Sequence, residues 1–179
     1  MSDLAKYPAS WRALHWLMAI LVLGLIPVGL WMTARGEAGL WDALTNTLYG
    51  SHKAIGFVVL LLMLVRVGMK VFMRAPAYPS SVSPRLQRAA KGLHHLMYVL
   101  LFATPLLGWA GVTAFPALIT LGGYHLPPMP GVPIDRALSG VLFQLHGFAA
   151  MALALLLVGH IGAAFRHMFR GDGIFKRML

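Results

Sequence analysis

The chain contains no cysteine, and few of its residues are charged. The lack of cysteine excludes disulfides, thiolate-bound iron–sulfur clusters and covalently attached c-type haem. Only 11% of the 179 residues carry a charge, of which five are acidic, whereas a soluble domain has about 25% charged residues. Hydrophobic residues make up 59% of the chain, so the composition predicts a membrane protein.

The formal net charge of +10 would suit a nucleic-acid-binding protein, but the basic residues stand at the ends of apolar runs and not on one continuous face. We therefore expect no nucleic-acid partner and interpret these residues as topology signals. The first apolar run is too long for the h-region of a cleavable signal peptide, and no small-x-small cleavage pattern follows it. It is interpreted as a membrane span.

Four apolar runs are each long enough to cross the roughly 20-residue hydrocarbon core. They cover about 11–33, 50–72, 93–115 and 138–167. Lipid cannot satisfy exposed backbone amides, and the alternation of a barrel strand is missing, so the spans must be helices. We predict one domain over residues 1–179, an all-α integral membrane four-helix bundle with up-down topology, and Pro27 and Pro105 as candidate kink sites.

The distribution of basic residues predicts the orientation of the bundle. The connection between the second and third spans holds five cations and no acid, namely Lys70, Arg74, Arg85, Arg88 and Lys91. The C-terminal end is also basic, and the other two connections hold few cations. The positive-inside rule therefore places both termini in the cytoplasm of a bacterial inner membrane protein. Connections 34–49 and 116–137 then face the periplasm, and we expect the longer one to cap the bundle.

Four histidines, His15, His52, His146 and His160, lie inside the apolar runs or at their ends. His146 and His160 are fourteen residues apart, which on a helix is a rise of about 21 Å with a rotation of about 40°, so they share one face. By depth, His15 pairs with His160 near the inner surface and His52 with His146 near the outer one. A low-spin b-type haem needs two imidazoles from different helices on opposite sides of its iron. The pattern predicts two haem b groups with these four iron ligands.

A single histidine in a span is equally compatible with a packed, hydrogen-bonded core residue or an interfacial one. Four histidines that form two pairs at matching depths favour the interpretation that they are haem ligands. The fourth span is also rich in glycine and alanine, which would let a flat macrocycle approach the backbone, although small residues equally serve helix association. A transporter or scaffold without haem is the alternative from another class.

Several motifs resemble the prokaryotic cytochrome b561 family over nearly the whole chain. They are Arg12-Ala-Leu-His15-Trp16, Ser51-His52-Lys53-Ala-Ile-Gly56, Leu93-His-His-Leu-Met-Tyr98, Thr104-Pro105-Leu-Leu-Gly108, Leu145-His146-Gly147 and Val158-Gly159-His160. The resemblance implies that the four histidines bind two haems b. It also implies a superoxide:ubiquinone oxidoreductase, because the family includes an enzyme that passes electrons from periplasmic superoxide to ubiquinone. The alternative is a quinol-oxidising cytochrome b subunit that serves a periplasmic redox partner protein.

Three further residues are candidates for site roles. Arg66 follows His52 by fourteen residues, so it should lie at the depth of the inner haem and pair with a propionate, unless it only snorkels to the interface. Lys53 could steer superoxide toward the outer haem or simply anchor the span. His167 lies two turns past His160, where similar family members have a histidine near the quinone, so it is expected to contact the quinone or relay a proton. An interfacial histidine without such a role is its alternative.

The remaining histidines and the methionines are weaker candidates. His94 and His95 project about 100° apart and cannot both face the core. One of them could replace an inner ligand or touch a quinone, but we favour positions at the interface or beside the ligands. His125 is expected to be an ordinary loop residue. Met63, Met97 and Met151 could be axial ligands in principle, yet methionine is a common packing residue in apolar helices.

Overall fold

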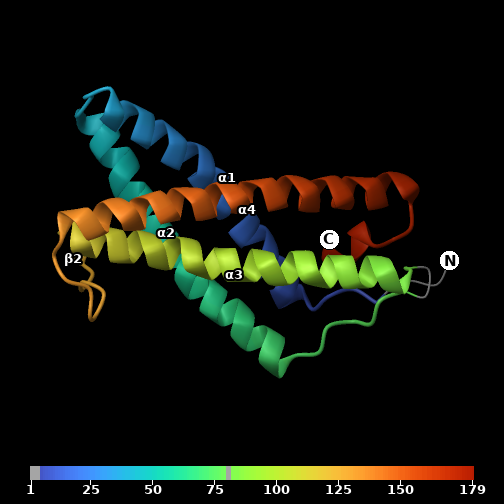
Figure 1. Cartoon of the computed structure of the whole chain (residues 1–179). Coiled ribbons are helices and arrows are strands. Elements are labelled where there is room, and N and C mark those ends of the chain that lie inside the picture. The colour runs from blue at the N-terminus through green and yellow to red at the C-terminus, as the bar shows by residue number, and fades with distance from the viewer. Residues whose placement is uncertain (1–4, 80–81) are drawn as a thin grey trace.

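The computed structural model describes residues 5–79 and 82–179 and contains four long helices (Figure 1). They are α1 (Ala9–Glu37), α2 (Ala43–Phe72), α3 (Pro84–Ala114) and α4 (Arg136–Arg170), and a short 3-10 helix, η1 (Phe175–Met178), follows them. Each long helix has the length and apolar composition of a membrane span. The prediction of an all-α, four-helix membrane bundle is confirmed. α1 and α3 run on through Pro27 and Pro105.

All four helices extend beyond the apolar runs, most clearly at the start of α2 and α3. Asp42 caps α2 by accepting a hydrogen bond from the Thr45 N–H, so the helix begins well before residue 50. Ser83 caps α3 in the same way, and Pro84 occupies the first helical position, where its missing N–H costs nothing. These first turns are polar, so hydropathy alone could not reveal them.

α3 and α4 lie side by side along their length, α1 packs on α2, and α2 packs on α3 (Figure 1). Within the part of the chain that the structure describes, α4 makes no comparably close packing with α1 or α2. An apolar cluster from all four helices fills the middle of the bundle: Met18, Val22, Val59, Met63, Met97 and Leu153. Met63 is completely buried in it. The core therefore lies halfway along the helices, between the two levels predicted for the histidines.

One end of the bundle carries a short β-hairpin, and we call it the hairpin end. Strands β1 (Thr120–Leu121) and β2 (Tyr124–His125) pair antiparallel around Gly122 and Gly123, whose positive φ angles permit the tight turn. The hairpin was not predicted from the sequence. The segment that follows it is bonded to α3: the Trp109 indole donates to the Pro127 carbonyl at 3.2 Å. The connection therefore covers the end of α3.

The other end holds the first described residues and the C-terminal residues, and we call it the termini end. The Tyr7 N–H donates to the Arg177 carbonyl at 3.1 Å, and the Trp16 indole donates to the Met178 carbonyl at 2.7 Å. The Arg12 guanidinium also donates to the Leu179 carbonyl. The chain enters and leaves the bundle on the same side, as an even number of spans requires.

Candidate functional site

His52 on α2 and His146 on α4 face each other near the hairpin end. Their ring centres are 6.0 Å apart and their planes are inclined by 78°. The two residues belong to helices that do not pack closely on each other, so only the side chains bridge the distance. The structure thus brings together the pair predicted as the outer ligands.

The Thr104-Pro105-Leu-Leu-Gly108 segment of α3 contacts the His146 side chain and fixes its position. Nδ1 of His146 lies 2.8 Å from the Thr104 carbonyl oxygen, which can only accept, so Nδ1 carries the proton and donates it. Nε2 is then left unprotonated and able to bind a metal. A Cβ on Gly108 would lie 3.1 Å from Nδ1, so glycine provides the room for this approach.

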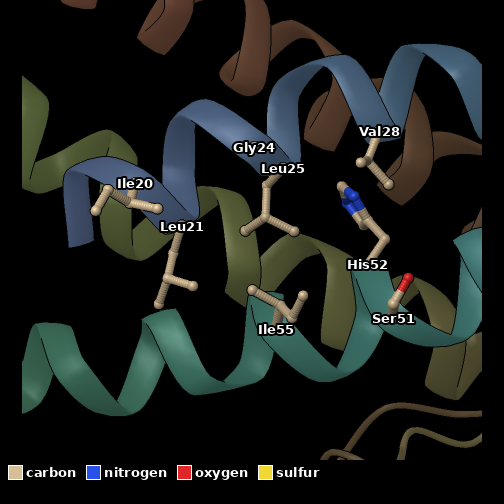
Figure 2. A pocket seen from close by; sticks show the side chains of 8 residues that line it. All are labelled: Ile20, Leu21, Gly24, Leu25, Val28, Ser51, His52 and Ile55. Carbon is tan, nitrogen blue, oxygen red and sulfur yellow. The ribbon is translucent and has the colours of Figure 1, made fainter. Parts of the chain in front are cut away.

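His52 packs against a glycine of the neighbouring helix α1. A Cβ on Gly29 of α1 would come within 3.0 Å of the His52 ring. Figure 2 shows the ring of His52 directed toward α1, beside Val28. It borders a cavity of about 170 Å³ that is lined almost entirely by apolar side chains of α1 and α2. Among the described residues, its buried Nδ1 has no hydrogen-bond partner.

His15 on α1 and His160 on α4 form the second pair, near the termini end. Their ring centres are 6.2 Å apart and their planes are inclined by 77°, almost the same arrangement as in the first pair. Arg66 of α2 lies beside them: its Nε donates to the Tyr98 hydroxyl at 2.9 Å, and one terminal nitrogen is 3.4 Å from Nδ1 of His15. Arg66 is thus half-buried at the depth that the sequence predicted.

His94 also reaches this level, with its ring centre 5.4 Å from that of His160. It belongs to α3, which packs directly along α4, whereas His15 comes from α1, which does not. A flat group between two imidazoles needs helices that stay apart. The geometry therefore favours His15 over His94 as the partner of His160, and places His94 beside the pair. His95 is exposed, and His125 is an exposed hairpin residue within 3.1 Å of the Thr120 hydroxyl.

His167 lies at the end of α4, where Nδ1 is 2.6 Å from a carboxylate oxygen of Asp172. A cavity of about 200 Å³ opens beside it, between the last turns of α4 and the C-terminal residues. Phe175, Lys176 and Leu179 line its far wall. His167 is seven residues past His160, about 10 Å along the helix, so the cavity lies close to the second histidine pair.

Comparison with known proteins agrees with this arrangement. The family model described as prokaryotic cytochrome b561 matches residues 6–179. Cytochrome b561 homolog 2 of Escherichia coli (strain K12) is 32% identical over 176 residues, which cover 97% of this chain and 91% of that protein. The chain belongs to the prokaryotic cytochrome b561 family. It is therefore a multi-pass membrane protein that binds haem b and transfers electrons.

The two histidine pairs suit the haem of a cytochrome b561. A bond between a metal and an imidazole nitrogen is about 2 Å long, and that nitrogen lies about 1 Å from the ring centre, so two imidazoles on opposite sides of one iron have centres about 6 Å apart. Both pairs show this separation. Within residues 5–79 and 82–179, no group of three or more His, Asp or Glu side chains gathers as a metal site. Two imidazoles without further protein ligands fit an iron that is already held in a macrocycle better than they fit a bare metal ion.

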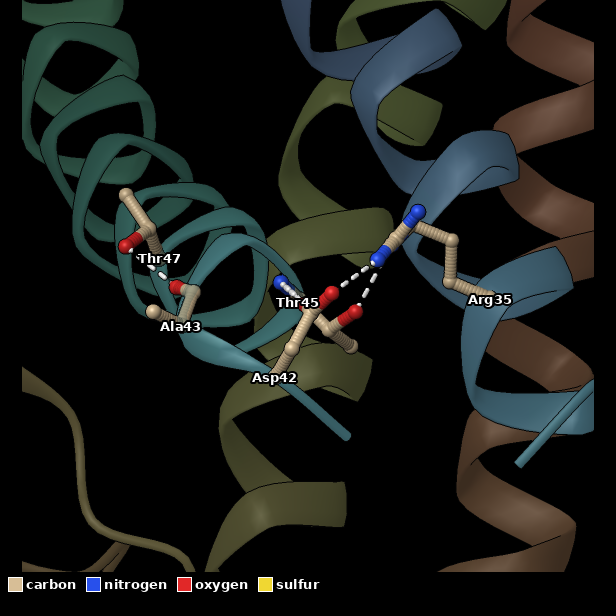
Figure 3. Close-up of polar contacts among 5 residues, drawn as sticks. All are labelled: Arg35, Asp42, Ala43, Thr45 and Thr47. Atoms are coloured by element: carbon tan, nitrogen blue, oxygen red, sulfur yellow. Dashed lines mark hydrogen bonds and ion pairs between the residues drawn. The ribbon is translucent and has the colours of Figure 1, made fainter. Parts of the chain in front are cut away.

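The basic residues of the hairpin end are largely engaged. Arg35 pairs with Asp42 at 2.6 Å and donates to the Thr45 hydroxyl at 2.8 Å, which closes the α1–α2 connection (Figure 3). The hydrogen bond from the Thr45 N–H, with that from Arg35, holds the pKa of Asp42 below its usual range. Lys53 donates from Nζ to the Leu118 carbonyl at 3.0 Å, and its charge has no carboxylate partner in the described part of the chain.

Several residues of the site were missed by the sequence reasoning. Gly29, and the roles of Gly108 and of the Thr104 carbonyl, depend on contacts between helices that no spacing within one span reveals. Asp172 was not among the site residues predicted from the sequence. Its position five residues after His167, following Gly171, is a signal that could have found it, because a left-handed glycine turns the chain back at a helix end.

Proposed function

We propose that this protein is a dihaem cytochrome b that oxidises superoxide at the hairpin end and reduces ubiquinone at the termini end. His52 and His146 would hold one haem, and His15 and His160 the other. The observation that carries the proposal is the repeated geometry: two imidazole pairs with nearly the same separation and inclination, on either side of one apolar core.

Charge supports an orientation with the termini end in the cytoplasm. The hairpin end has three cations, Arg35, Lys53 and Arg136, against three acids, Glu37, Asp42 and Asp135. The other twelve lysines and arginines belong to the termini-end half of the bundle, where Asp172 is the single acid among the described residues. The positive-inside rule then assigns the termini end to the cytoplasm and the hairpin end to the periplasm.

Haem iron supplies one-electron chemistry when bound, and the protein residues set its surroundings. The Thr104 carbonyl makes the His146 imidazole a stronger donor, while Nδ1 of His52 has no hydrogen-bond partner among the described residues. Arg66 places a positive charge beside His15. If His15 binds iron through Nε2, its Nδ1 carries a proton, so Arg66 cannot donate to it and can donate to a propionate instead.

Superoxide as the donor is inferred from the family resemblance, and the structure offers a modest electrostatic reason for it. The cations and acids of the hairpin end balance, so no strong positive field covers that face. Lys53, directly after His52, still places a cation without a carboxylate partner beside the first pair. Local attraction of a small anion at this point is the role we assign to Lys53.

The acceptor site in this proposal is the cavity at His167. Two superoxide ions are oxidised to two molecules of dioxygen, and their two electrons, with two protons from the cytoplasmic side, reduce one ubiquinone to ubiquinol. His167 is positioned to hydrogen-bond a quinone carbonyl and to deliver a proton to it. The apolar wall of the cavity suits the ring and the first part of an isoprenoid tail.

The proposal is tested by stopped-flow mixing of the purified, oxidised haem protein with superoxide, followed through the haem α-bands. We expect fast reduction that superoxide dismutase abolishes, and continued turnover when a short-chain ubiquinone is added. The matched control is the same protein with His146→Ala, which should lose the reaction with superoxide together with one haem.

Reduction of the haems by ubiquinol but not by superoxide would refute the proposed donor. It would favour the quinol-oxidising subunit that serves a periplasmic partner. A purified protein with one haem per chain would refute the dihaem assignment itself.

A further inference from the structure

We propose that the C-terminal segment Asp172–Leu179 is part of the quinone site, in which Asp172 positions His167 and η1 forms one wall of the cavity. This inference rests on the proposed function, because it concerns the cavity where ubiquinone would be reduced. Asp172 is a positioning residue, because it acts through His167 and does not itself contact the quinone carbonyl that is reduced.

The backbone geometry after α4 creates this arrangement. Gly171 adopts a left-handed conformation with φ of 63°, and Gly173 follows with φ of 81°, so the chain reverses direction within three residues. The reversal places the Asp172 carboxylate against the imidazole of the preceding turn. One oxygen of Asp172 is 2.6 Å from His167 Nδ1, and the other accepts the Ile174 N–H at 3.1 Å. Both carboxylate oxygens are thus occupied.

This hydrogen bond determines which nitrogen of His167 serves the cavity. Burial tends to raise the pKa of Asp172, but the hydrogen bonds from His167 and Ile174 outweigh it, so the pKa lies below its usual range. The carboxylate is therefore ionised at neutral pH and accepts a hydrogen bond from the Nδ1–H of His167. Nε2 is left as the atom that can donate to or accept from a quinone oxygen.

The wall opposite His167 is held by Arg177. This side chain is only 5% exposed, and its guanidinium donates to the carbonyls of Ala5, Pro76 and Ala77 at 3.0–3.1 Å. It also lies over the Tyr7 ring, 5.4 Å from the ring centre. Arg177 therefore ties η1 to the N-terminal segment and to the α2–α3 connection. Phe175 and Lys176, which precede it, are fixed in the cavity wall as a result.

The inference is tested by the reaction of the reduced haems with ubiquinone, which does not require superoxide. The holoprotein is reduced with dithionite, freed of excess reductant and mixed with a short-chain ubiquinone, and haem reoxidation is followed. We expect Asp172→Ala to slow the maximal reoxidation by about tenfold or more, as loss of an orienting partner of a histidine commonly does. Asp172→Glu should recover part of the rate. Glu37→Gln, an exposed acid at the hairpin end, is the matched control and should leave this half-reaction unchanged.

Two further measurements separate positioning from a general structural effect. In a double-mutant cycle, Asp172→Ala should add almost nothing to the loss caused by His167→Ala, because it acts through that side chain. An azido-ubiquinone should label the peptide that contains residues 171–179 upon illumination, and excess ubiquinone should prevent the labelling. Haem content and α-bands should match the unmodified protein in every variant.

The outcomes distinguish this inference from the proposed function. If the reduced unmodified protein is not oxidised by ubiquinone, the proposed function fails. If it is oxidised but Asp172→Ala reacts at the same rate, or the two substitutions are additive, the positioning role is overturned. Labelling confined to other parts of the chain would overturn the wall assignment.

Discussion

Replacement of Gly108 by alanine is the sharpest test of the hairpin-end pair. The added methyl group would lie 3.1 Å from Nδ1 and 3.2 Å from Cε1 of His146, closer than ordinary van der Waals contact. The imidazole would have to move by a few tenths of an ångström, and the 2.8 Å hydrogen bond to the Thr104 carbonyl would lengthen. The perturbation thus reaches the ligand without changing it chemically.

The expected cost can be estimated from three contributions. Overpacking in a tight contact costs about 1–3 kcal/mol, and the hydrogen bond contributes about 1 kcal/mol. Alanine offsets about 1 kcal/mol because it favours the helix over glycine. A net loss of about 1–3 kcal/mol at the haem site corresponds to a fall in haem affinity of about fivefold to about 150-fold. Because the imidazole also becomes a weaker donor, the reduction potential of this haem should rise.

The assay is the haem-to-protein ratio together with a redox titration of the α-bands. Gly140→Ala is the matched control, since a Cβ there meets no neighbouring atom, and it should leave both quantities unchanged. Gly29→Ala, which crowds His52 from α1, should weaken the same haem. If Gly108→Ala retains two haems per chain with both potentials unaltered, then the contacts with Thr104 and Gly108 do not position His146. Its assignment as a ligand then loses its main structural support.

Three other predictions concern the remaining parts of the bundle. His15→Ala should remove one haem per chain while His94→Ala retains both, as measured by absorbance; the opposite result would make His94 the ligand. Lys53→Gln should lower the rate of haem reduction by superoxide by about twofold at low ionic strength. This is the effect expected when one positive charge acts in water on an anion about 8 Å from it. An unchanged rate and salt dependence would exclude steering by Lys53. Arg177→Leu removes three charge-assisted hydrogen bonds of about 1.5–3 kcal/mol each, so it should destabilise the holoprotein by about 4.5 kcal/mol or more. An unaltered midpoint in thermal unfolding followed through the haem bands would contradict that role of Arg177.

The sequence predicted the fold and the pairing of the histidines because both depend on regularities within single helices. The apolar runs are set by the thickness of the membrane, and the fourteen-residue spacing of His146 and His160 fixes their common face by helical geometry alone. Depth then paired them with histidines on other spans. The same arithmetic placed Arg66 at the depth of His15, where the structure shows it.

Features that depend on contacts between segments could not be predicted in this way. The early starts of α2 and α3 depend on caps in polar sequence, and the β1–β2 hairpin is only two residue pairs long. Depth alone pairs His15 with His160, but the structural reason to prefer His15 over His94, that α3 and not α1 packs along α4, is a contact between helices. Likewise, the environment of Arg177 is formed by carbonyls about a hundred or more residues away in the chain.

α4 explains why so much of the site lies along one line. His146, Leu153, His160 and His167 follow one another every seven residues, and each step of two turns drifts by only about 20° around the helix. Leu153 is 4% exposed in the central core, so an apolar side chain separates the two imidazole levels where a polar one would be costly. The other helices supply the partners: α2 at the first level, α1 at the second, and the C-terminal turn at the third. In the proposed function, the continuous helix α4 would therefore carry one side of the path across the membrane, while α1, α2 and the C-terminal turn each bring one side chain to the matching depth.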